Sequence, residues 1–335
     1  QHHGRYGTVE LELQLPPAQG GTWLLDVASA RQEVYPTPGD KPQVRAGSLE
    51  QDLARRDFSV NAMALLLPSV LTTEIKLLDP HGGQRDLADR QLRFLHANSL
   101  SDDPTRLVRA ARYAARLKFD LAPEARLQAQ STMSAWPWQF GPELSNVPPA
   151  LGTRLGKELY LLLTNEFWQI GLESLQRWEG LKLIDPGLQS DVSWRRRLVW
   201  ARRFNLPVMM AFLGGATEPL KIAQRLHLPH TQQQILHQSQ SLRNRLEGQL
   251  MMPQKPSEWS EFLETSVRSP LAVLLLLTAG FIPRRPLLHW YFRWRHCKSP
   301  KNASELIQQG WQPGPCLGHE MTRLRMKALD EKYYK

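Results

Sequence analysis

Two short segments of this chain combine arginines with carboxylates at spacings that suit phosphate binding. In the first, Arg55 and Arg56 precede Asp57, and Asn61 follows four residues after the aspartate. On one helix turn, Asp57 and Asn61 would share a face. A guanidinium group can hold a phosphate through two parallel hydrogen bonds, so the segment is a candidate phosphate site. A solvated helix start, with the arginines as surface charges and Asp57 as a cap, fits the spacing equally well.

The second segment predicts a helix with one basic face, starting near Asp102-Asp103-Pro104. At about 100° per residue, its arginines fall on one side and its leucines and alanines on the neighbouring side. These arginines are Arg106, Arg109, Arg112 and Arg116. They repel one another unless an anion covers them, and a nucleoside triphosphate or an RNA backbone would serve. The alternative has Asp103 as the N-cap, Pro104 as the first helical residue and a solvated arginine face.

The composition is that of a folded, basic protein. The chain has 335 residues, a length that exceeds a single small binding module. Of these residues, 41% are hydrophobic and 22% are charged, as in ordinary folded proteins. Lysine and arginine outnumber aspartate and glutamate by 42 to 32, a net charge of +10. This excess indicates a polyanionic partner, nucleic acid first.

Cysteine content and hydropathy exclude other classes. Two cysteines, Cys297 and Cys316, are too few for a disulfide framework or a cysteine-rich zinc site. They are typical of a reducing compartment, so we expect a cytoplasmic location. The most apolar run covers residues 271–282 and ends at Pro283, which is short of the roughly 20 residues that a bilayer span needs. It predicts a core helix, and we expect no membrane partner.

β patterns dominate the first hundred residues. Alternating apolar and polar residues over 7–13 predict a strand with one buried face, and Thr22–Ala28 predicts its antiparallel partner. Residues 36–47 are rich in proline and glycine and predict a mobile loop. The turn sequence at residues 79–83 lies between two apolar stretches, 75–78 and 92–95, and predicts a further β pairing.

Helical periodicity takes over after about residue 98, with proline-rich breaks between short helices. We therefore predict an α+β protein, with an α/β head followed by an all-α extension. The extension mixes arginines with aromatic residues, as in Trp194–Arg197 and in the stretch from Arg284 to Lys298. We expect the arginines to contact phosphates. Trp290, Tyr291, Phe292 and Trp294 could stack on bases, but a place in the core is more typical at this spacing.

Taken together and in order, these segments resemble the class II tRNA nucleotidyltransferase and bacterial poly(A) polymerase family, which includes the CCA-adding enzymes. The likeness covers the first 120 or so residues closely and the rest loosely. The matching pieces are Tyr6-Gly7-Thr8, Ala30–Glu33, Asp52-Leu53, Arg55–Ala62, Asp79–Gly83, Arg85–Leu87, Asp102–Arg106, Arg109–Arg112 and, late in the chain, Gly310, Pro313–Pro315 and Gly318.

The resemblance implies three domains and an activity. A partial nucleotidyltransferase head of the polymerase β type would cover residues 1–97. A helical neck over 98–165 would bind the nucleotide base and RNA, and a helical body and tail over 166–335 would bind tRNA by shape. The implied reaction adds C or A nucleotides, or both, to the 3′ end of tRNA from CTP and ATP without a template. The RNA 3′ hydroxyl attacks the α-phosphate with two Mg²⁺ ions, and pyrophosphate leaves.

The resemblance also implies roles for particular residues. Asp103 and Arg106 match the pair that hydrogen-bonds the base edge, for which a carboxylate and a guanidinium offer complementary donors and acceptors. Asp57 and Asn61 would organise the pocket. The triphosphate would be held by Arg56, Arg109 and Arg112.

One part of the family pattern does not occur in this chain. The glycine-rich turn and the strand with the Asp-x-Asp metal pair are expected upstream of Gln1, so we assign no catalytic residue and no metal ligand here. Asp26 is at best a lone auxiliary carboxylate, and a polar strand-end residue is the favoured interpretation. We expect a fragment of the enzyme. The alternatives are a poly(A) polymerase and a non-catalytic RNA-binding relative.

Overall fold

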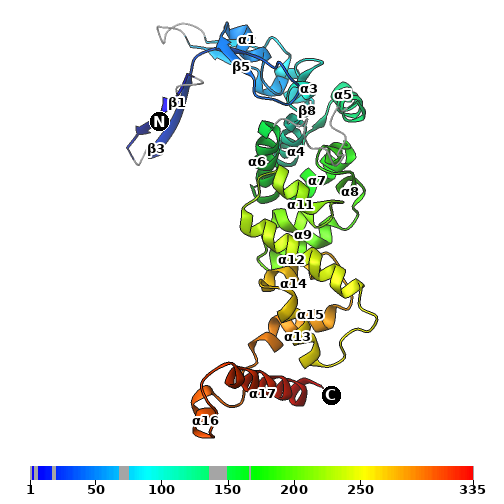
Figure 1. Cartoon of the computed structure of the whole chain (residues 1–335). Helices are drawn as coiled ribbons and strands as arrows, with labels where there is room; N and C mark the ends of the chain where they lie inside the picture. The colour runs from blue at the N-terminus through cyan, green and yellow to red at the C-terminus, as the bar shows by residue number, and fades with distance from the viewer. Residues whose placement is uncertain are drawn as a thin grey trace. The chain divides into compact units, whose positions relative to one another are not determined.

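We describe the protein from a computed structural model. The described residues are 2–3, 7–16, 20–67, 75–135, 149–165 and 167–334, so Tyr6 of the first matching motif lies outside them. The chain divides into two compact units, residues 1–183 and 184–335, whose elements are labelled in Figure 1. The division into three domains at residues 97 and 165 stays a prediction.

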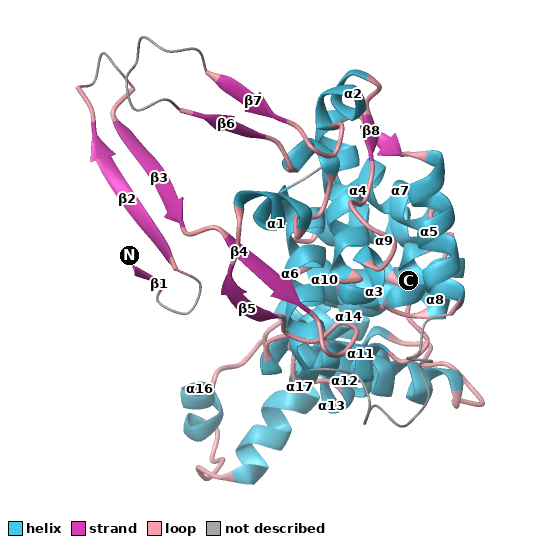
Figure 2. Ribbon diagram, turned by 90° about the horizontal axis from the view of Figure 1, so that it is seen from above, coloured by secondary structure: helices cyan, strands magenta, loops and turns pink. Residues whose placement is uncertain are grey.

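The first unit opens with the predicted hairpin. Strands β2 (Thr8–Gln14) and β3 (Thr22–Ala28) pair antiparallel with Leu11 opposite Leu25, and the short β1 (His2–His3) pairs with β2. The apolar face that we expected to be buried is exposed: Leu11 is 42% exposed and Trp23 58%. Figure 2 shows β2 and β3 standing away from the helices, so no described element covers that face. The alternation of apolar and polar residues predicted the strand, but it could not show which element packs against the apolar face.

A second hairpin takes up part of the predicted mobile loop. Strand β4 (Arg31–Val34) pairs antiparallel with β5 (Gln43–Ala46), so the prediction of a loop over 36–47 is wrong in its second half. The backbone pairing fixes residues whose composition indicated flexibility. Helix α1 (Leu49–Ala54) follows, and the Ser48 side chain and Gln51 form a capping box at its start.

The predicted pairing of residues 75–78 with 92–95 is also wrong. Strand β7 (Lys76–Leu78) pairs with β6 (Ala64–Leu66), and β8 (Gln91–Leu92) pairs in parallel with β9 (Asp120–Leu121). The intervening sequence starts a helix in place of a hairpin turn. The Asp79 carboxylate accepts hydrogen bonds from the backbone N–H groups of Gly83, at 2.6 Å, and Gln84, at 2.9 Å, where α2 (Gly83–Ala88) begins.

Helices form the rest of the first unit. They are the 3₁₀ turn η3 (Ser59–Asn61), α3 (Ser99–Asp102), α4 (Thr105–Leu117), α5 (Pro123–Ser134), α6 (Pro149–Asn165), α7 (Trp168–Arg177) and the 3₁₀ turn η5 (Gly180–Leu183). The predicted apolar face of α4 is buried from Leu107 to Ala114, whereas Leu117 at the end of the helix is 40% exposed, and α4 packs against α6 and α7. Phe58, before α4 in the chain, lies edge-on to Tyr113 of α4 with ring centroids 5.6 Å apart, so residues of the head also pack against this helix.

The second unit is all-helical, which confirms the α+β class and the helical extension. Its elements are α8 (Pro186–Ser190), α9 (Trp194–Arg203), α10 (Val208–Leu213), α11 (Pro219–Arg225), α12 (His230–Glu247), α13 (Pro256–Ser266), α14 (Pro270–Thr278), α15 (Arg284–Phe292), η6 (Trp294–His296), α16 (Ala303–Gln308) and α17 (Pro315–Tyr333). Helix α14 is the predicted core helix, buried on nearly all sides. Among the described helices, none combines the length and apolarity needed to cross a bilayer.

The aromatic residues of the second unit divide between core and surface. Trp290 and Trp294 are 3% and 5% exposed, which confirms the core interpretation for them. Phe292 is 54% exposed and lies against Phe204 with ring centroids 5.9 Å apart, so the core interpretation is wrong there. Phe292 is the last residue of α15, where the helix turns its side chain out of the packed face.

We expect Gly83→Ala to destabilise the first unit by about 1–3 kcal/mol, the usual cost of overpacking a close contact. A Cβ on Gly83 would meet the backbone carbonyl of Ser59 and lie 2.9 Å from Cγ of Met63. Gly318→Ala is the control, because its Cβ would enter open space in α17 and alanine favours the helix. Thermal unfolding followed by circular dichroism measures both, and an unchanged Gly83→Ala transition would contradict the packing described here.

Candidate functional site

The Asp57 carboxylate organises the turn between α1 and β6. Asp57 is 8% exposed, and its Oδ1 accepts hydrogen bonds from the Phe58 backbone N–H at 3.0 Å and from Asn61 Nδ2 at 2.9 Å. The predicted pairing of Asp57 with Asn61 is therefore present, but Asp57 precedes the 3₁₀ turn that carries Asn61, and no α-helix joins the two. The backbone of Phe58 is extended, so no helix continues through this segment. The Phe58 side chain is fully buried.

Arg56 closes over the same turn. Its Nη1 donates to the Asn61 carbonyl oxygen at 3.0 Å, and its Nη2 lies 3.3 Å from Asp52 Oδ2. Asp52 also accepts from Arg55, with Nη2 to Oδ1 at 2.7 Å. The Arg56 side chain remains 42% exposed, so an anion can still reach it. Asp52 is absent from the predicted site, although it lies three and four residues before the two arginines, the spacing of helical ion pairs.

Helix α4 does not include the aspartates that we placed at its start. Asp102 ends α3, Asp103 is extended, and α4 begins at Thr105. The residue before a proline disfavours helical backbone angles, so Pro104 forces this break at Asp103. Asp103 still caps α4, since its Oδ1 accepts from the Thr105 backbone N–H at 3.1 Å and from Thr105 Oγ1 at 2.7 Å.

Asp103 also faces a residue that sequence reasoning missed. Its Oδ2 lies 3.6 Å from Nη1 of Arg154 on α6, and Arg154 Nη2 donates to the Gly39 carbonyl oxygen at 2.6 Å. Burial, followed by the charge of Asp103, raises the pKa of the nearby Tyr35 to about 12. Arg154 therefore joins Asp103 to the β4–β5 loop.

Arg106 is a buried residue and not part of a solvated face. It is 4% exposed, and its Nη1 donates to the carbonyl oxygen and the hydroxyl of Ser99. Its Nη2 donates to the Arg55 carbonyl oxygen at 2.8 Å. The solvated alternative for this residue is wrong, because α3 and the end of α1 enclose it. Arg106 thereby connects the two segments that the sequence presented separately.

Arg109 and Arg112 share one carboxylate, Glu158 on α6. Glu158 is 7% exposed, and its Oε1 lies 3.3 Å from Arg109 Nη2 while Oε2 accepts from Arg112 Nη1. Arg109 Nη1 also lies 3.2 Å from Asp57 Oδ2. Burial alone would lower the pKa of Arg109, but the charges of Glu158 and Asp57 raise it above its ordinary value. The repulsion predicted for the arginine face is thus compensated from within the protein.

The structure joins all the predicted site residues into one contact network. Asp57 contacts Asn61 and Arg109, Arg56 contacts the Asn61 backbone, and Glu158 links Arg109 to Arg112. Arg106 and Asp103 attach to it through backbone and helix-cap contacts. Glu158 and Arg154 were missed, although they lie four residues apart on one helix and Glu158 has the sign opposite to the arginine face.

We call these residues the arginine network: Arg56, Asp57, Asn61, Asp103, Arg106, Arg109, Arg112, Arg154 and Glu158. Arg56, at 42% side-chain exposure, and Arg109, at 33%, are open enough to bind a polyphosphate by paired hydrogen bonds. Asp103 and Arg106 are held in fixed positions beside them. The network can therefore neutralise a triphosphate next to an anchored carboxylate and guanidinium.

The described residues do not fit a metal centre. No group of three or more His, Cys, Asp or Glu side chains in this part of the chain converges as a metal site requires. Asp26 lies on the exposed strand β3, opposite Glu10 of β2. We therefore derive no step through a metal ion from these residues.

Comparison with known proteins supports the family resemblance. Residues 4–93 match the model of the poly(A) polymerase head domain. The CC-adding tRNA nucleotidyltransferase of Deinococcus radiodurans is 42% identical over 176 residues, which is 52% of this chain and 42% of the relative. The A-adding tRNA nucleotidyltransferase of Aquifex aeolicus is 35% identical over 198 residues, 59% of this chain and 22% of the relative. The chain thus spans less than half the length of these curated relatives.

Solved structures agree on the fold. A structure described as the apo form II of a CCA-adding enzyme has a TM-score of 0.64 at 23% identity and matches 97% of this chain and 78% of the other. The Thermotoga maritima CCA-adding enzyme complexed with tRNA has a TM-score of 0.61 at 23% identity, over 99% of this chain and 77% of the other.

Glu158→Gln should destabilise the first unit by roughly 2–3 kcal/mol. Breaking a buried ion pair typically costs 3–5 kcal/mol, and the one-third exposure of Arg109 lets water replace part of the lost interaction. Glu124→Gln is the matched control, because its pair with Arg93 is exposed and an exposed ion pair contributes little to stability. Urea unfolding measures both, and equal effects for the two variants would contradict the role of Glu158.

Asp52 should contribute stability that disappears in acid. Burial acts to raise the pKa of Asp52, but the Arg55 hydrogen bond and charge, with the Arg31 N–H and Arg56, hold it below the ordinary value of 3.8. A lowered folded-state pKa gives a contribution that is complete above about pH 5 and is lost as the pH falls below 3.8. Asp52→Asn should therefore cost about 2 kcal/mol at pH 7. Unfolding measured from pH 7 to pH 3 should show the wild type and the variant converging, and a constant difference would refute this assignment.

Proposed function

Because this chain belongs to the tRNA nucleotidyltransferase and poly(A) polymerase family, we propose that its protein adds C or A nucleotides, or both, to the 3′ end of tRNA. The substrates would be CTP and ATP, and pyrophosphate would leave. The observation that carries the proposal is the arginine network, in which partly exposed arginines lie beside an anchored aspartate and arginine. The names of relatives in this family, CC-adding and A-adding tRNA nucleotidyltransferases, support the choice of tRNA.

In this proposal Arg56, Arg109 and Arg112 hold the triphosphate. The incoming phosphate oxygens would compete with Glu158 and Asp57 for the guanidinium groups of Arg109 and Arg112. A triphosphate carries more charge than one carboxylate and accepts several hydrogen bonds at once, so the exchange is favourable. Asp57 and Asn61 hold the turn that follows Arg56 in place while the triphosphate replaces the carboxylates.

Asp103 and Arg106 would choose the base. Their contacts with Thr105, Ser99 and the Arg55 backbone fix both groups before a nucleotide arrives. Of the Arg106 nitrogens, Nη1 and Nη2 are engaged, while Nε makes no hydrogen bond within the described residues. A fixed acceptor beside fixed donors can distinguish cytosine and adenine from the other bases by their edges.

Mg²⁺ would supply the two-metal activation of the 3′ hydroxyl and of the leaving pyrophosphate when bound. The described residues do not supply its ligands, and the expected Asp-x-Asp pair upstream of Gln1 stays a prediction. The cytoplasmic location and the three-domain division also stay predictions of the sequence.

Two alternatives make different predictions. A poly(A) polymerase would incorporate A repeatedly and C poorly, whereas a CC-adding enzyme would stop after two C residues. A non-catalytic RNA-binding relative would bind tRNA with strong salt dependence and would not bind CTP or ATP.

We expect Asp103→Ala or Arg106→Ala, in the complete protein, to reduce discrimination between correct and incorrect nucleotides by about 10- to 100-fold, the value of one good base-edge contact. tRNA binding should persist. Incorporation of each of the four nucleotides into tRNA lacking its 3′ end measures the effect. Arg126→Ala is the control, because this half-buried arginine on α5 pairs with Asp120 outside the arginine network. Unchanged C and A incorporation by a folded Asp103→Ala variant would overturn the proposed role.

A further inference from the structure

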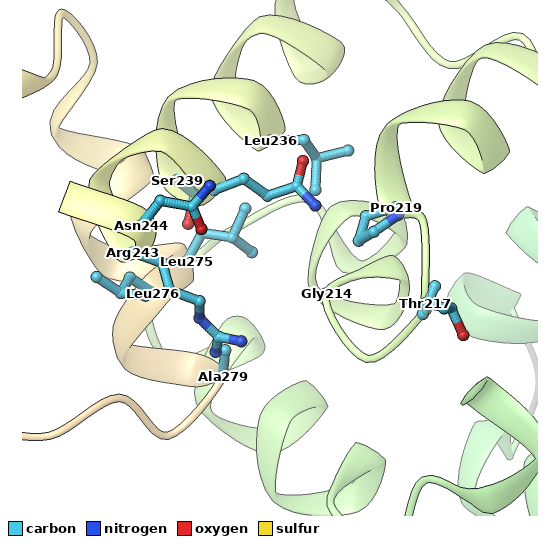
Figure 3. A pocket seen from close by; sticks show the side chains of 12 residues that line it. Gly214, Thr217, Pro219, Leu236, Ser239, Arg243, Asn244, Leu275, Leu276 and Ala279 are labelled. Atoms are coloured by element: carbon cyan, nitrogen blue, oxygen red, sulfur yellow. The ribbon is translucent and has the colours of Figure 1, made fainter. Parts of the chain in front are cut away.

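The second unit contains a pocket of about 290 Å³ that lies outside the arginine network. It is formed by α12, α14 and the segment that leads into α11. Figure 3 shows Arg243, Asn244 and Leu275 on one side of the opening, with Thr217 and Pro219 across from them. Every lining residue belongs to the second unit, so the pocket is complete within that unit.

One face of α12 lines the pocket with polar side chains. Ser239, Gln240, Arg243 and Asn244 follow the spacing of neighbours on a helix surface. Ser239 is 7% exposed, yet its hydroxyl makes no hydrogen bond within the described part of the chain. Gln240 and Asn244 likewise make no side-chain hydrogen bond there, and Arg243 has only a 4.0 Å contact with Glu247. These side chains are therefore free to hydrogen-bond a ligand or water in the pocket.

The lining that α14 contributes beside α12 is apolar. Leu275, Leu276 and Ala279 come from α14 and the turn after it, which pack against α12. Beyond Ala279, a Cβ on Gly280 would lie 2.6 Å from Nη2 of Arg196 and 3.8 Å from Nη2 of Arg284. Thr217, across the pocket, donates from its backbone N–H and its hydroxyl to the Asp185 carboxylate at 2.9 and 3.2 Å, so the positive charge of the lining is that of Arg243. The combination favours a ligand with a flat, weakly polar body and a negative group.

We propose that this pocket binds a single nucleotide. The Gln240 and Asn244 amides each present a donor beside an acceptor, the pattern that pairs with a base edge. Arg243 is placed to bind the phosphate, and the α14 leucines support the ring. The volume lies just below the range for small-ligand sites, about 300–1,000 Å³, which suits one nucleotide and excludes a duplex. The nucleotide can be free or can be one residue of a bound RNA, because the recognised groups are the same.

Photo-crosslinking of the full chain, followed by peptide mapping, tests this inference and separates the two sources. The free probe is 8-azidoadenosine monophosphate, and the RNA probe is a single-stranded oligonucleotide that carries 4-thiouridine. We expect at least one probe to label peptides of α12 or α14, with competition by the unlabelled ligand. Labelling by the free probe alone identifies a mononucleotide site, and labelling by the oligonucleotide alone identifies a site for a residue of RNA.

The variants Asn244→Ala and Arg243→Gln should reduce this labelling at least tenfold. Asn244 is exposed, so its truncation leaves the core intact even if Arg243→Gln folds poorly. The controls on the same helix are Gln234→Ala and Arg245→Gln, which lie outside the pocket and should label like the wild type. Absence of label in α12 and α14 with both probes, or labelling that both pocket variants leave unchanged, overturns the inference.

This outcome is independent of the proposed function. Labelling of peptides that contain the arginine network by 8-azido-ATP reports the nucleotide site of the first unit. Labelling of α12 without labelling of the arginine-network peptides refutes the proposed function alone. Labelling of the arginine-network peptides without labelling of α12 or α14 refutes the pocket alone.

Discussion

The carboxylate of Glu158 is the interaction on which the site depends. Arginines at three-residue spacing crowd one face of α4, and each guanidinium raises the energy of the next unless negative charge lies between them. Glu158 reaches this face from α6 and binds Arg109 and Arg112 with its two oxygens, while Asp57 binds Arg109 from the other side. Because the three carboxylate contacts come from two separate segments, the charge balance of α4 also fixes where the turn and α6 lie.

Arg106 shows that folding and recognition use the same groups. Its guanidinium is held by the backbone oxygens of Ser99 and Arg55, and this burial places it next to the Asp103 cap. The turn beneath is itself supported, since Ser59 Oγ donates to Asp86 Oδ2 at 2.5 Å and Arg93 Nε donates to the same carboxylate at 3.2 Å. A group whose position is fixed by the core loses little entropy on meeting a ligand, which is the condition for selective recognition.

The second unit also contains arginines and aromatic residues, but it arranges them around an apolar helix. Its apolar helix α14 is buried by α9, α12 and α15, so the arginines and amides of those helices line its edges. Where the packing is close, as at Trp290 and Trp294, aromatic rings are core. Where a helix ends, as at Phe292, the ring is exposed and lies against Phe204. Arg295 lies over the neighbouring Tyr291, with its guanidinium carbon 4.3 Å from the ring centroid.

The sequence alone determined the features that depend on local spacing. Alternation identified the β2–β3 hairpin, helical periodicity identified the apolar face of α4 and the core helix α14, and the four-residue spacing paired Asp57 with Asn61. The order of the motifs indicated the family. Each of these follows from contacts between residues close in sequence, which periodicity and turn chemistry record directly.

Only the tertiary structure decided which groups face one another across long separations. It showed that Glu158 compensates Arg109 and Arg112, that Arg106 is buried against Ser99 and Arg55, and that β7 pairs with β6 and not with residues 92–95. It also left the β2–β3 apolar face uncovered by the described residues and assembled the α12–α14 pocket. Periodicity predicts that a face needs a partner, but the partner's identity depends on how distant segments pack, because that contact has no local signature in the chain.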